Sequence, residues 1–180
     1  FSTEEKPRFV AASVGPTNKT CSMSPDVSNS ATRDITYAQL YDAYLEQIAA
    51  FEEGGADAIL IETVFDTLNA KAAIDATMEV ERRSGRLMPI MLSITVSDLA
   101  GRTLSGQTLD AVLASVSSYP LFSVGLNCSF GADQMKPFLE ELARRAPYYI
   151  SAYPNAGLPN SLGQYDQTAE TMAPLIKDFV

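Results

Sequence analysis

The chain contains no histidine. This absence excludes a cysteine–histidine nucleophilic pair, an imidazole metal ligand and an imidazole general base within these residues. Cysteine is scarce, with Cys21 and Cys128 alone, so we expect no disulfide framework, and reduced thiols in a cytoplasmic setting fit better. If Cys128 takes part in chemistry, it must act as a thiolate held by something other than histidine, and a metal ion is the first candidate.

Positive charge and long apolar runs are also in short supply. Lysine and arginine together number 13 against 22 acidic residues, a net charge of −9, so we expect neither nucleic acid nor an anionic membrane as a partner. No apolar stretch approaches the roughly 20 residues that cross a bilayer. Residues 1–8 lack the layout of a signal peptide. With 46% apolar residues, residues 1–180 are expected to form one domain with a substantial core.

Short apolar segments alternate with amphipathic segments along the whole chain. We expect strands at residues 9–14, 57–62, 89–96, 121–127 and 148–153, and helices at 37–53, 66–83, 108–117, 132–145 and 168–179. The strands are apolar nearly throughout, which is typical of parallel strands covered on both faces. The fold class is therefore α/β with a parallel sheet.

Two architectures fit this alternation, a doubly wound sheet and part of a (β/α)8 barrel. The first strand is not followed by the Gly-x-Gly-x-x-Gly pattern of dinucleotide-binding folds, which mildly favours the barrel. A whole barrel needs about 250 residues, so 180 residues would supply only part of one.

Polar residues follow the predicted strands, and the carboxyl ends of parallel strands share one rim, where α/β proteins bind ligands. Glu62 should be partly buried and therefore needs a partner, either a substrate ammonium or a structural salt bridge or helix cap. Cys128 could be a reactive thiol or a small buried apolar residue, and Asn155 could bind a ligand or simply form a turn. We interpret Cys21 as incidental and Tyr153 as strand packing.

Five stretches at the strand ends carry a family resemblance. They are Val14–Thr20, Leu60–Ala73, Ser105–Thr108, Gly125–Cys128 and Pro154–Asn160. In the same order along essentially all 180 residues, they resemble the homocysteine-binding domain of cobalamin-dependent methionine synthase. The run Glu-Thr-Val-Phe-Asp-Thr-Leu-Asn-Ala-Lys at residues 62–71 is highly specific.

The resemblance implies a fold and a site. That domain is a (β/α)8 TIM barrel that binds homocysteine through zinc held by three cysteine thiolates, and this chain would supply barrel strands three to seven. Cys128 would be the first zinc ligand, at the end of strand six. Glu62 would receive the substrate ammonium, Asn155 would contact the amino-acid end, and Asn127 would orient the zinc site or the substrate. No catalytic residue separate from the zinc site is implied.

The resemblance also implies a reaction, a methyl transfer in methionine biosynthesis. The zinc-activated homocysteine thiolate would accept a methyl group from methylcobalamin to give methionine. Cobalamin and methyltetrahydrofolate would be brought by other domains of the parent protein, which are the expected partners.

The remaining two zinc ligands would be an adjacent Cys-Cys pair beyond Val180. With Cys128 alone, we expect the isolated chain neither to hold zinc at a fully formed site nor to catalyse methyl transfer. Two open strand edges and an uncovered apolar inner face would favour self-association. Two alternatives stay open: another α/β barrel enzyme with a carboxylate at a strand end, and a fragment without catalytic function.

Overall fold

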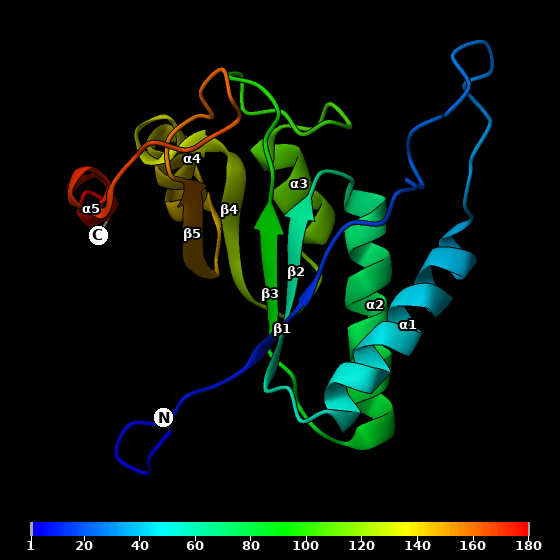
Figure 1. Cartoon of the computed structure of the whole chain (residues 1–180). Helices are drawn as coiled ribbons and strands as arrows, with labels where there is room; N and C mark the ends of the chain where they lie inside the picture. The colour runs from blue at the N-terminus through cyan, green and yellow to red at the C-terminus, as the bar shows by residue number, and fades with distance from the viewer. Residues whose placement is uncertain (1, 180) are drawn as a thin grey trace.

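Five strands form one sheet in which every neighbouring pair is parallel. The computed structural model describes residues 2–179, while Phe1 and Val180, the two ends of the predicted domain, lie outside the described residues. The strands are β1 (Ala11–Val14), β2 (Ala58–Val64), β3 (Ile90–Ile94), β4 (Leu121–Gly131) and β5 (Tyr149–Asn155). Their order across the sheet is their order along the chain (Figure 1), whereas a doubly wound sheet reverses its order at a switch point. The sheet is therefore of the barrel type.

A helix follows each strand, since parallel neighbours need a crossover connection. The helices are α1 (Tyr37–Glu53), α2 (Thr67–Ser84), α3 (Leu109–Val116), α4 (Ala132–Arg145) and α5 (Ala169–Lys177). Thr36 caps α1 by accepting a hydrogen bond from the Gln39 amide, and Asp66 caps α2 in the same way from the amides of Leu68 and Asn69. The predicted helices 37–53 and 132–145 are confirmed at both ends, and the other three differ by one or two residues. Within residues 2–179, no helix combines the length and apolar character that a bilayer crossing requires.

The two faces of the sheet differ in polarity, because successive residues of a strand point to opposite sides. On one face, Val14, Ile61, Leu92, Val124 and Leu126 are buried in the core beneath the helices. The strand register places Ser13, Leu60, Glu62, Met91, Ser93, Gly125, Asn127, Ser151 and Tyr153 on the opposite side, the inner face. The described helices do not cover this face. An open inner face agrees with the expectation for part of a barrel, but this face is more polar than the apolar inner face that was expected.

The sheet is strongly curved, as one contact across the inner face shows. The Tyr153 hydroxyl of β5 lies 3.4 Å from Oε2 of Glu62 on β2. In a flat sheet, three inter-strand steps of about 4.8 Å would separate these strands by about 14 Å, with both side chains pointing away from the sheet plane. Closure toward a barrel turns the side chains toward one another. The fold is an incomplete barrel of the (β/α)8 type.

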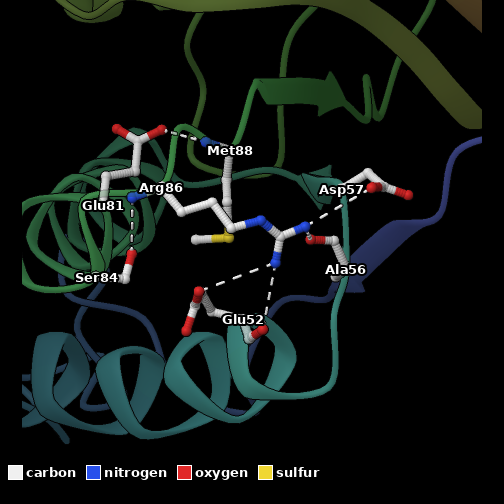
Figure 2. A network of polar contacts seen from close by, with 7 residues as sticks. All are labelled: Glu52, Ala56, Asp57, Glu81, Ser84, Arg86 and Met88. Atoms are coloured by element: carbon white, nitrogen blue, oxygen red, sulfur yellow. Dashed lines mark hydrogen bonds and ion pairs between the residues drawn. The ribbon is translucent and has the colours of Figure 1, made fainter.

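Arg86 joins several segments at the amino-terminal end of the sheet (Figure 2). Its guanidinium donates to the carbonyl oxygens of Glu52 at 3.4 Å and Ala56 at 2.6 Å, and it lies 3.6 Å from one Asp57 carboxylate oxygen. The other Asp57 oxygen accepts a hydrogen bond from the Val10 amide at 2.8 Å. These bonds tie the end of α1 to the starts of β1 and β2, at the end of the barrel that serves stability rather than chemistry.

Candidate functional site

The carboxyl ends of β2 and β4 have an unusual backbone. Within residues 2–179, three residues other than glycine have a positive φ: Thr63 at 60°, Cys128 at 59° and Ser129 at 62°. This region is uncommon for side-chain-bearing residues, and most unfavourable for a β-branched one such as threonine. The strand register shifts at the same places, so β4 does not end at Asn127 as expected but continues past a bulge to Gly131. Such conformations persist only where surrounding contacts hold them.

Asn127 supplies those contacts. Its Oδ1 accepts hydrogen bonds from the Thr63 amide at 3.1 Å and the Ser93 hydroxyl at 2.7 Å. Its Nδ2 donates to Thr63 Oγ1 and to Cys128 Sγ, both at 3.0 Å. The Asn127 side chain is 1% exposed, and the hydroxyl of Thr95 donates to its carbonyl oxygen at 3.2 Å. One buried amide therefore joins the ends of β2, β3 and β4 and orients the candidate thiol.

Cys128 is half-buried at the bulge of β4, so it is not the fully buried apolar residue considered as the alternative. Its sulfur receives the Asn127 hydrogen bond described above. Zinc needs three protein ligands in a catalytic site and four in a structural one. Among residues 2–179, no three acidic or cysteine side chains are grouped as metal ligands. The described residues therefore do not fit a complete zinc site, although a thiol is a suitable single ligand.

Glu62 has none of the structural partners considered for it. Among the described residues its carboxylate forms no ion pair, and the cap of α2 is Asp66 instead. The Ser13 hydroxyl donates to Oε1 of Glu62, and the Tyr153 hydroxyl lies 3.4 Å from Oε2. Two neutral hydroxyl groups hold this half-buried carboxylate at the inner face, and no described cation is paired with it. This arrangement suits a cationic ligand group.

Tyr153 and Ser13 belong to this site, although the sequence indicated packing for the tyrosine and nothing for the serine. Burial raises the pKa of Tyr153 to about 12, with a smaller contribution from the nearby Glu62 carboxylate. The hydroxyl therefore stays protonated and acts as a donor at neutral pH. The sequence did contain a signal for the position of Tyr153 on the inner face. Ser151 and Tyr153 alternate onto the same face of β5, immediately before Pro154 near the end of the strand.

Asn155 lies at the carboxyl end of β5, where it pairs with Gly131 of β4. It is half-buried, and its carbonyl oxygen accepts a hydrogen bond from the Gly157 amide at 2.8 Å. The left-handed residue of this turn is Gly157, with φ of 82°, and not Asn155. A left-handed turn therefore does not explain the asparagine. The structure places it on the same rim as Asn127 without a direct bond between their side chains.

The second half of the 62–71 run holds the long loop that connects β1 and α1. Asp66 accepts hydrogen bonds from the amide and hydroxyl of Ser22, in addition to capping α2. The Asn69 side chain accepts from the Cys21 amide and donates to the Lys19 carbonyl oxygen, each at 2.9 Å. Cys21 is buried in the core, where burial and the charge of Asp66 raise its pKa, which opposes thiolate formation. Its role here is structural, and this half of the run shapes the rim.

The Ser105–Thr108 stretch, in the loop after β3, forms hydrogen bonds with the residues that follow β2. The Ser105 hydroxyl donates to the Phe65 carbonyl oxygen at 2.7 Å, and the Thr67 hydroxyl donates to Oε1 of Gln107 at 2.9 Å. Thr108 caps α3. The loops after β2 and β3 are thereby joined, which fixes the position of the β2 end that carries Glu62.

A curved parallel sheet with a thiol, an amide and a carboxylate at its carboxyl rim defines the class of (β/α)8-barrel proteins with a rim site. The sequence model of the homocysteine S-methyltransferases matches residues 1–180, and the chain belongs to this family.

Crystal structures of the homocysteine methyltransferase MmuM from Escherichia coli are similar in fold. The apo form has 23% sequence identity and a TM-score of 0.62, covering 83% of this chain and 49% of that chain. The oxidized form has 23% identity and a TM-score of 0.51, covering 64% and 39%. The metallated form has 24% identity and a TM-score of 0.52, covering 65% and 40%. The chain therefore spans about half the length of this structural relative.

Proposed function

We propose that this chain forms part of a homocysteine-binding site at which a methyl group is transferred to the homocysteine sulfur. Glu62 carries the proposal: among residues 2–179 its carboxylate forms no ion pair, and neutral donors hold it on the inner face. The family membership and the structural likeness to a homocysteine methyltransferase support the same conclusion.

The site offers one group for each end of the substrate, and hydrogen bonds link the residues that carry these two groups. Glu62 directly precedes Thr63, and Cys128 directly follows Asn127, which bonds Thr63 through both its side-chain oxygen and nitrogen. Homocysteine carries an ammonium at one end and a thiol at the other. Glu62 would bind the ammonium, and Asn155 would contact the same amino-acid end from β5. The thiol end would then lie on the Cys128 side of the rim.

In the transfer step, the homocysteine sulfur gives its proton to solvent and attacks the methyl carbon of the donor. The new S–CH3 bond forms as the bond from methyl to donor breaks, and the bonding electrons leave with the donor. The residues of this chain bind and orient the substrate for that attack. The specific proposal is the methionine synthase reaction, with methylcobalamin and methyltetrahydrofolate delivered by other domains in the cytoplasm.

Zinc remains part of the proposal through Cys128 as one ligand. A thiolate is a preferred zinc ligand, and bound zinc favours the deprotonated form of a substrate thiol. Because the described residues group no second or third ligand with Cys128, residues 1–180 in isolation should carry little zinc and should not catalyse transfer. Metal analysis of the purified chain checks this, and near-stoichiometric zinc bound through Cys128 would refute it. Open strand edges at β1 and β5 should also favour self-association, which light scattering measures.

Calorimetric titration with L-homocysteine tests the function. Glu62→Gln keeps the shape of the side chain but removes its charge, and should weaken binding by about 10- to 100-fold, as expected for loss of a charge-assisted bond. Glu53→Gln, at the exposed end of α1, is the matched control and should bind as the unaltered chain does. Equal affinity of the Glu62 variant and the control would exclude the proposed ammonium site.

A further inference from the structure

Tyr153 contacts Glu62 from the far side of the curved sheet. Its hydroxyl lies 3.4 Å from Oε2, while the Ser13 hydroxyl of β1 donates to Oε1. The two carboxylate oxygens thus each have one hydroxyl neighbour, and the two hydroxyl groups come from opposite edges of the sheet. This arrangement prevents free rotation of the carboxylate about its terminal bond.

The arrangement also leaves acceptor capacity for a ligand. An ionised carboxylate offers about four lone-pair directions, and two are used by these hydroxyl groups. The remaining directions can accept the N–H donors of an ammonium, which has three donors and no acceptor. Tyr153 is 37% exposed and stands beside Asn127 in the strand register, so its hydroxyl is within the open inner face rather than in the core.

We propose that Tyr153 is a positioning residue for Glu62, and that Tyr153 and Ser13 together set the selectivity of the site for a ligand that carries an ammonium group. The inference rests on the proposed homocysteine site and adds the residues that orient its carboxylate. Tyr153 acts through Glu62 and not on the reacting sulfur. Its loss should therefore weaken recognition of the amino group while the rest of the substrate binds as before.

Two thiols that differ in one group separate these effects: L-homocysteine and 4-mercaptobutanoate, the same molecule without its ammonium. Calorimetric titration of the full chain should give an affinity for homocysteine about 5- to 10-fold lower in Tyr153→Phe, the loss expected for one hydrogen bond to a charged group. Affinity for 4-mercaptobutanoate should stay within about twofold, because the missing hydroxyl acts only on ammonium recognition. Tyr149→Phe, on the same strand but 71% exposed, is the control and should change neither affinity.

Ser13→Ala provides a second variant at an exposed position, where failure to fold is not a concern. It should show the same selective loss for homocysteine. Unchanged homocysteine affinity in both variants, or an equal loss for both ligands, overturns the inference. If the unaltered chain binds neither thiol, the proposed function fails, whereas binding by the unaltered chain with no selective loss in the variants refutes the positioning role alone.

Discussion

Replacement of Asn127 by alanine should be among the most destabilising single changes at the rim. The side chain forms four hydrogen bonds, two to Thr63 and one each to Ser93 and Cys128. The alanine would leave the Ser93 hydroxyl, in a residue that is 0% exposed, and the part-buried Thr63 amide without partners. Each of these two orphaned buried groups costs about 1–3 kcal/mol, so we expect a loss of about 2–6 kcal/mol in the free energy of unfolding.

Urea unfolding followed by circular dichroism measures this loss, with the exposed loop residue Asn18 changed to alanine as the matched control. A double-mutant cycle sharpens the test. Adding Ser93→Ala to Asn127→Ala removes the orphaned hydroxyl, so the double variant should be more stable than the sum of the single effects by about 1 kcal/mol. A loss below about 0.5 kcal/mol for Asn127→Ala would refute the reasoning, as would strict additivity in the cycle.

Three further changes test other parts of the molecule. Ser129→Gly removes the steric penalty that a side chain pays at φ of 62°, and should raise the free energy of unfolding by about 1 kcal/mol. Urea unfolding measures this gain, and no gain would count against backbone strain at the bulge. Arg86→Met should lower it by about 1–2 kcal/mol through loss of the bonds to Glu52 and Ala56, yet leave homocysteine binding unchanged in calorimetry. Burial raises the pKa of Tyr44 from 10.0 to about 12, so the folded chain holds this proton more tightly than the unfolded chain. The resulting stability is complete below pH 10 and is lost as the pH rises through 12. Tyr44→Phe should flatten that alkaline decline in urea unfolding, and an unchanged decline would contradict the assignment.

Local signals predicted the helices well. The Thr36 cap, the apolar spacing of Leu40, Tyr44 and Ile48, and the glycine after Glu53 all lie within one segment of chain and fix α1 at both ends. Strand bounds were less accurate at the rim, because the bulge that extends β4 depends on hydrogen bonds from β2 and β3. Nothing in the local sequence indicates that threonine or cysteine adopts a left-handed conformation.

The candidate site was predicted in part. Glu62 and Cys128 were singled out because they lie at the end of an apolar strand, and the role of Asn127 was implied by the family resemblance. The structure joins the three residues through Thr63. The sequence indicated packing for Tyr153, and its contact with Glu62 was not predicted. That contact joins residues 91 positions apart and exists only because the sheet is curved. A sequence pattern shows which face a residue takes but does not show how far the sheet bends.

The attachment of the long loop to the start of α2 has a consequence for the order of folding. Cys21 bonds Asn69 across 48 positions, and Ser22 bonds Asp66 across 44. Closing such a span costs chain entropy that is recovered only once α2 exists to receive these amides. The loop should therefore fold after the β2–α2 unit, although the loop comes earlier in the sequence. In pulse-labelling hydrogen exchange, the amides of Cys21 and Ser22 should gain protection no earlier than those of α2.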